Sequence, residues 1–254
     1  MSVKTDTSLP AARLRPSPNH NDRPEGARID LLILHYTGME SGAAALQRLI
    51  DPRSEVSAHY LVEEDGTILQ LVPEARRAWH AGVAFWAGAR DINDRSIGIE
   101  IVNPGHEYGY RPFPEAQIAA VTELARDICA RHAIAAERVL AHSDVAPARK
   151  QDPGELFPWA ELAANGVGVW VDPEPVGGGR YLQEGEEGQP VEALQSMLAL
   201  FGYEVPIDGV FGDATRLAVT AFQRHYRPQT VDGVADMSTI STLHRLLQRR
   251  PGLG

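Results

Sequence analysis

The segment from 142 to 153 gathers three side chains with useful chemistry: His142, Lys150 and Asp152. Its prolines and its lack of apolar periodicity predict a loop. An imidazole and a carboxylate ten residues apart converge only if that loop folds back, and a divalent metal would give it a reason to do so. A third ligand must come from elsewhere, and the best donor is His35, at the end of an apolar run. Two histidines and an aspartate would give Zn²⁺ three protein ligands and leave a fourth position for water, which is the catalytic pattern.

These residues lie within motifs that resemble a known family. The motifs are Leu34–Thr37, Val56–Tyr60, Ala78–Gly82 and His142–Gly154. Together they resemble the zinc-dependent N-acetylmuramoyl-L-alanine amidases, a group that includes the AmpD- and AmiD-like enzymes, phage lysozyme-like amidases and animal peptidoglycan-recognition proteins. The resemblance spans approximately residues 14–160. It implies zinc-dependent cleavage of the amide between N-acetylmuramic acid and L-alanine, with peptidoglycan or muropeptides as substrate.

Amide hydrolysis needs two groups besides the metal ligands. One takes the proton of water and later gives it to the leaving amine, and Glu100 fits because it faces away from the three isoleucines of the strand 97–101. The other stabilises the oxyanion, and Lys150 fits because it is two residues from Asp152. Both positions match those that the resemblance makes catalytic. The alternatives without a catalytic role are that Glu100 is an ordinary residue on a solvated sheet face and that Lys150 is a surface charge.

Three further residues are candidates for contact with the substrate. Tyr36 follows a predicted ligand, and His80 lies in a loop that could form a cleft wall. Arg149 could pair with a peptide carboxylate through its planar donor fork.

The order of the elements predicts an α/β domain. A buried strand at 29–35, a hairpin at 58–72, the strand 97–101 and a helix at about 114–132 indicate a mixed sheet flanked by helices. We expect residues 1–13 to be a flexible N-terminal arm and 14–165 to be the zinc amidase domain.

A Gly- and Pro-rich stretch at 166–181 reads as a linker. Beyond it, residues 182–250 predict a small domain of three helices. The sequence Asp-Gly-Val at 208–210 recurs at 232–234, each time before a helix start. This tail resembles the peptidoglycan-binding domain found beside many wall hydrolases. We therefore expect the amidase domain to act on small substrates without it.

Composition excludes several classes of protein. A net charge of −10 and a pI near 5.4 argue against a nucleic-acid binder. No apolar run approaches the ~20 residues of a transmembrane helix. The single cysteine, Cys129, allows no intrachain disulfide.

Because the N-terminus lacks the apolar core of a signal peptide, we expect a cytoplasmic protein, with the periplasm or cell envelope as the alternative. The sequence says nothing of the oligomeric state.

Two other functions remain open at this stage. A non-catalytic protein that binds or senses peptidoglycan could share the fold, but such a protein would typically lack a ligand or the general base, and all five candidates are present. A zinc peptidase of unrelated fold is disfavoured because the chain has no His-Glu-x-x-His helix.

Overall fold

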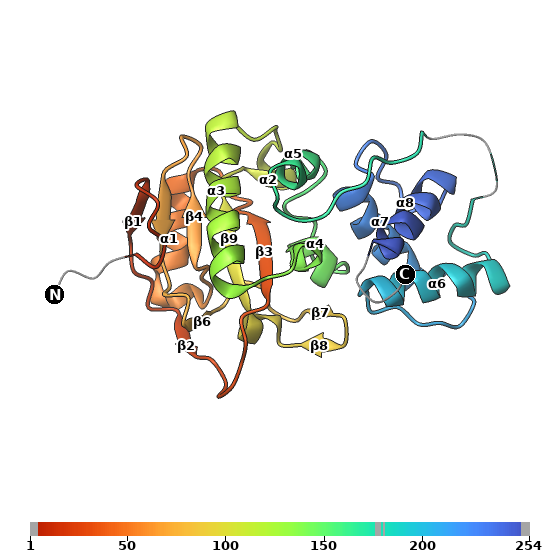
Figure 1. The fold of residues 1–254 in the computed structure, drawn as a ribbon, viewed down its shortest axis with the longest axis horizontal. Helices are drawn as coiled ribbons and strands as arrows, with labels where there is room; N and C mark the ends of the chain where they lie inside the picture. Colours follow the sequence, from red (N-terminus) through yellow and green to blue (C-terminus); the bar gives the residue numbers. More distant parts are fainter. Residues whose placement is uncertain (1–4, 176–178, 180, 250–254) are drawn as a thin grey trace.

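The computed structural model describes residues 5–175, 179 and 181–249. Its centre is a six-stranded mixed sheet (Figure 1). Only β4 and β5 pair antiparallel within this sheet, and its other neighbouring strands are parallel. In order across the sheet the strands are β1 (Ala12–Leu14), β5 (Ile68–Gln70), β4 (Tyr60–Val62), β9 (Ser96–Ile101), β3 (Leu31–Tyr36) and β10 (Val139–Ala141). The predicted α/β class with a mixed sheet is confirmed.

Shorter elements complete this domain. Two small antiparallel sheets pair β2 (His20–Asp22) with β6 (Arg76–Ala78) and β7 (Phe85–Trp86) with β8 (Ala89–Arg90). The helices are α1 (Gly42–Ile50), α2 (Gly105–Tyr108), α3 (Glu115–His132), α4 (His142–Val145) and α5 (Trp159–Ala164). Among the described residues, no helix combines the length and the apolar character needed to cross a membrane.

The alternation of side chains along β3 and β9 separates a core face from a functional face. Helix α3 lies across one face of the sheet (Figure 1), where Leu32, Leu34 and the three isoleucines of β9 pack against its apolar side. His35 and Glu100 point to the other face, because they are register partners on neighbouring parallel strands. The period of two read from the sequence therefore places both side chains on one side of the sheet.

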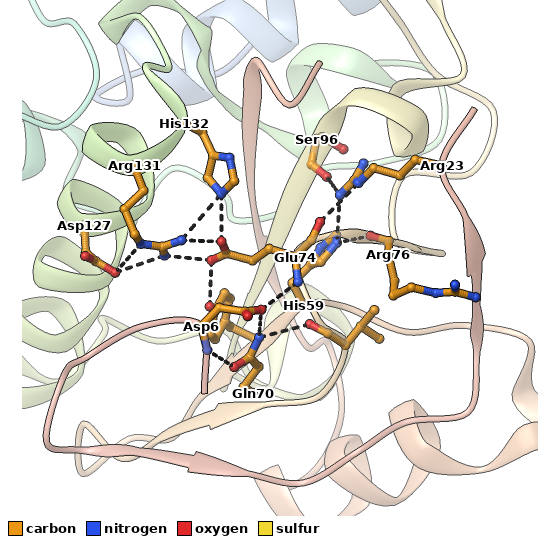
Figure 2. Close-up of polar contacts among 12 residues, drawn as sticks. Asp6, Arg23, His59, Gln70, Glu74, Arg76, Ser96, Asp127, Arg131 and His132 are labelled. Carbon is orange, nitrogen blue, oxygen red and sulfur yellow. Dashed lines mark hydrogen bonds and ion pairs between the residues drawn. The ribbon is translucent and has the colours of Figure 1, made fainter. Parts of the chain in front are cut away.

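The N-terminal segment is anchored rather than free. The N–H of Asp6 donates to Oε1 of Gln70 (2.7 Å), and its Oδ2 accepts the N–H of Glu74 (2.8 Å), as Figure 2 shows. Residues 12–14 then form β1 and extend the sheet beside β5. The prediction of a flexible arm over residues 1–13 was wrong from residue 5 onward, because its anchors are distant in sequence; residues 1–4 lie outside the described part.

Figure 2 also shows a buried charge cluster that ties the end of α3 to β4. Glu74 accepts hydrogen bonds from the hydroxyl of Tyr60 (2.6 Å), from Nη2 of Arg131 (2.8 Å) and from Nε2 of His132 (2.7 Å). Burial alone would raise the pKa of Glu74, but the hydrogen bonds from Arg131 and His132 outweigh it and lower the pKa to about 2.

The C-terminal domain contains the three predicted helices, α6 (Gln189–Phe201), α7 (Asp213–Tyr226) and α8 (Met237–Gln248). The internal repeat has a structural reason. Gln195 of α6 donates to Oδ1 of Asp208 (2.9 Å) and accepts the N–H of Gly209 (2.8 Å). Gln223 of α7 makes the same pair of bonds to Asp232 (3.0 Å) and Gly233 (2.8 Å). Each buried glutamine thus fastens one Asp-Gly turn to the preceding helix.

The predicted linker, 166–181, begins as packed structure. Val167 is buried in the cluster beneath α3, and Val171 belongs to a second cluster that also contains the core of the C-terminal domain. That second cluster includes Trp86 and Phe201, so the two domains share apolar contacts. Residues 176–178 and 180 of the linker lie outside the described residues.

Candidate active site

The three predicted metal ligands converge at the carboxyl ends of β3 and β10. The Nδ1 atoms of His35 and His142 are 2.9 Å apart, and Oδ2 of Asp152 lies 3.1 Å and 3.0 Å from them. All three residues are buried. His35 ends the apolar run of β3, and His142 opens α4 directly after β10. Because β3 and β10 are parallel neighbours, their ends bring the two imidazoles together. The loop folds back as predicted, with the N–H of Ser143 donating to the carbonyl of Asp152 (3.0 Å).

Hydrogen bonds behind the ligands determine which ring nitrogen of each histidine carries the proton. The hydroxyl of Ser96 donates to the carbonyl of Ile92 (2.7 Å), so its oxygen accepts from Nε2 of His80 (3.1 Å). Nδ1 of a neutral His80 is then an acceptor, and it takes the Nε2–H of His35 (3.0 Å). Nε2 of His142 likewise donates to the carbonyl of Ala81 (3.1 Å). In the neutral rings, both Nδ1 atoms facing Asp152 therefore carry lone pairs.

This donor set fits a metal. Two imidazole lone pairs and a carboxylate oxygen about 3 Å apart repel one another unless they share a cation. Zinc bonds of ~2.0 Å at tetrahedral angles would place ligand atoms ~3.3 Å apart, close to these separations. Burial, with a contribution from His142, lowers the pKa of His35 to about 4, which favours the neutral ring.

Glu100 lines the cleft beside these ligands. Its Oε2 is buried and has no hydrogen-bond partner within the described part of the chain. Burial raises the pKa of Glu100 well above its usual value; Asp152 adds to the rise and Lys150 opposes it. A carboxyl with raised proton affinity and no fixed partner suits proton transfer.

Lys150 lines the same cleft, and its backbone N–H donates to the carbonyl of Ala146 (3.0 Å). The structure thus brings together all five residues for which the sequence predicted metal binding or catalysis. The cleft measures about 470 Å³, which suits a small organic substrate.

The three predicted substrate residues also border the cleft, with different surroundings. The hydroxyl of Tyr36 donates to Nδ1 of His106 (2.9 Å), whose Nε2 faces Glu155 (3.2 Å). Burial and the charge of Asp152 raise the pKa of Tyr36 to about 12, so the hydroxyl keeps its proton. Arg149 donates through Nη2 to the carbonyl of Ala81 (3.1 Å) and to that of Val83.

His80 lies behind the ligands, with both ring nitrogens engaged by His35 and Ser96. Gly98 makes this position possible, since a Cβ there would lie 2.5 Å from Cγ of the His80 ring. His80 therefore orients the ring of His35. A contact between His80 and the substrate stays a prediction.

The chain matches the N-acetylmuramoyl-L-alanine amidase family over residues 25–155 and a peptidoglycan binding domain family over 187–243. It is 42% identical over 236 residues to the N-acetylmuramoyl-L-alanine amidase AmiD of Escherichia coli, covering 87% of this chain and 83% of that protein. The chain belongs to the N-acetylmuramoyl-L-alanine amidase family. It is an enzyme, and the non-catalytic alternative is set aside.

Solved structures agree with this assignment. The complex of the Escherichia coli amidase AmiD with anhydro-N-acetylmuramic acid-L-Ala-D-gamma-Glu-L-Lys superposes with a TM-score of 0.75 at 38% identity, over 89% of this chain and 92% of that one. AmpDh3 of Pseudomonas aeruginosa in complex with anhydromuramic pentapeptide gives 0.73 at 30% identity, over 99% and 100%. This amidase therefore resembles both proteins in sequence and in fold across both of its domains.

Sequence reasoning missed several residues that shape the site of this amidase. Asn93 accepts the backbone N–H groups of His80 (3.1 Å) and Ala81 (2.8 Å) through Oδ1, and Ser96 ends the chain of bonds from His35. His106, which belongs to none of the sequence motifs, forms part of the cleft wall. Single polar residues in a loop carry no periodic signal, so only the folded arrangement reveals them.

Proposed function

We propose that this amidase is a zinc hydrolase whose ligands are His35, His142 and Asp152. The observation that carries the proposal is the convergence of one carboxylate with two imidazole lone pairs, each ring being directed by a hydrogen-bond partner behind it. A zinc ion held there would supply Lewis-acid chemistry, polarising the scissile amide and making water more acidic.

Glu100 takes the proton of the attacking water and returns it to the amine nitrogen of the leaving L-alanine. Its raised pKa suits both transfers, because the group must bind a proton and then release it near neutral pH. Lys150 lines the same cleft and stabilises the negative charge that develops on the amide oxygen. Tyr36 and Arg149 form parts of the wall against which the muropeptide is positioned.

Metal content and single-turnover rate, measured together, test these roles. Glu100→Gln should keep about one zinc per chain and lose ~10²–10⁴ in rate, the usual range for a general base. His142→Ala should lose metal and activity together. Glu107→Gln is the matched control, since it removes another carboxylate that lines the cleft. Wild-type rate in Glu100→Gln would refute the general base, and full activity in metal-free protein would refute the zinc site.

We further propose that the substrates are muropeptides, including the anhydro forms bound in the two related structures. The C-terminal domain would add binding to polymeric wall. Digesting intact sacculi and purified anhydromuropeptides in parallel, with products resolved by mass, separates these substrates; release of stem peptide from neither would refute the proposal. The cytoplasmic location expected from the sequence stays a prediction.

A further inference from the structure

One buried carboxylate joins the metal-binding turn to the C-terminal domain. Asp144 lies in α4, two residues after His142, and is fully buried. Its Oδ2 accepts the backbone N–H of Ala141 (2.8 Å), which caps the short helix. The same carboxylate accepts the hydroxyl of Tyr203 (2.7 Å) and Nδ1–H of His225 (2.6 Å). Two of its three donors therefore come from the other domain.

The donors are themselves held firmly. His225 is sandwiched between Trp159 of the amidase domain and Tyr226, each with its ring centroid 3.7 Å away. Nε2 of His225 is buried without a hydrogen-bond partner among the described residues, so Nδ1 is the ring nitrogen that donates a proton, and it donates to Asp144. Tyr203 is also buried, and its ring meets Trp86 edge-on at 5.1 Å.

A second contact supports the loop whose Ala81 carbonyl orients His142. The carbonyl of Ala81 accepts from His142, and the chain continues from there into the β7–β8 hairpin. In that hairpin, the N–H of Ala87 donates to the carbonyl of Gly202 (2.8 Å). Gly202 allows the approach, because a Cβ there would lie 2.6 Å from the ring of Trp86. Both the turn that carries His142 and the loop that orients it therefore rest on the C-terminal domain (Figure 1).

We propose that Tyr203 and His225 are positioning residues for the amidase site, which through Asp144 fix the turn that aims Nδ1 of His142 at the metal. The proposal rests on the proposed metal role of His142. A four-residue helix has too few internal hydrogen bonds to hold its own geometry, so its cap decides where its first residue points. The C-terminal domain is then part of the catalytic unit, contrary to our expectation that the amidase domain acts without it.

The test measures zinc affinity in the full chain by competition with a chromophoric chelator, together with the visible spectrum of the Co²⁺-substituted protein. Tyr203→Phe removes only a hydroxyl, and His225→Leu removes the donor together with the stacked ring while keeping an apolar group. Each should weaken zinc binding by up to ~10-fold, the low end for partners of metal ligands, and alter the cobalt bands. His225→Asn should restore both readouts, since its amide places an N–H where Nδ1 was.

Glu204→Gln is the matched control. It removes an exposed ion pair with Arg90 at the same interface without touching Asp144, so zinc affinity should stay at the wild-type value. Unchanged affinity and cobalt spectrum in both Tyr203→Phe and His225→Leu would overturn the proposal, whatever happens to thermal stability. If His225→Leu fails to fold, Tyr203→Phe alone decides. A wild-type chain with no zinc affinity would instead refute the proposed zinc role itself.

Discussion

The buried carboxylate of Glu74 should make the amidase domain sensitive to acid. Its pKa lies at about 2, against 4.5 for an ordinary glutamate, because Arg131 and His132 hold the charged form despite burial. Since a factor of ten in proton affinity is worth ~1.4 kcal/mol, this difference corresponds to roughly 3 kcal/mol of stability. The folded pKa lies below the unfolded one, so the contribution is fully present above about pH 4.5 and is lost as the pH falls toward 2.

Glu74→Gln removes the charge while keeping the shape of the side chain. At pH 7 we expect the variant to be about 2–3 kcal/mol less stable, which lowers the urea midpoint by ~1 M for a slope of 1–3 kcal/mol/M. The difference from wild type should shrink between pH 4.5 and pH 2, because the wild-type carboxyl then becomes neutral as well. Urea titrations followed by circular dichroism at pH 7, 4 and 3 measure this difference.

Glu64→Gln is the control for Glu74→Gln. It removes an exposed ion pair with Arg111, and we expect less than ~1 kcal/mol at any pH. Equal midpoints for wild type and Glu74→Gln at pH 7 would refute the reasoning. So would a deficit that stays constant down to pH 3, because that result would mean that the cost comes from packing rather than from charge.

Three further predictions concern the site and the interface. Ser96→Ala removes the acceptor for His80, so zinc affinity measured by chelator competition should fall ~10-fold; wild-type affinity would show that the ring orientations do not depend on it. Lys150→Ala should keep its zinc and lose ~10²–10³ in kcat, and loss of metal instead would assign Lys150 to loop structure. Gly202→Ala forces a Cβ against Trp86 at positive φ and should lower the free energy of unfolding, measured in urea, by about 1–3 kcal/mol. An unchanged urea midpoint would mean that the hairpin can move away from the new Cβ at no cost.

The sequence predicted the catalytic face well because its signals are local. The apolar run before His35 specifies a central strand, and the alternation of isoleucines turns Glu100 to the opposite face. Parallel pairing then brings the ends of β3, β9 and β10 to one edge. The short spacing of His142, Lys150 and Asp152 confines them to a single loop.

The contacts that support this face could not be predicted in the same way. The bonds from Tyr203 and His225 to Asp144 join residues separated by 59 and 81 positions. Nothing periodic in the sequence links Tyr203 or His225 to a turn in another domain. The prediction of a flexible N-terminal arm failed for the same reason, since Asp6 is bonded to Glu74, which lies 68 positions away.

Strand β3 gives the C-terminal domain a second physical connection to the site. Leu31 and Ile33 of β3 point to the same face as His35, and they belong to the hydrophobic cluster that includes Trp86 and the core of the C-terminal domain. Successive residues on one strand face lie ~7 Å apart, so the interface cluster ends close to the first metal ligand. A rigid strand transmits displacement along its length. Changes at the domain interface should therefore reach His35 through β3 as well as His142 through α4.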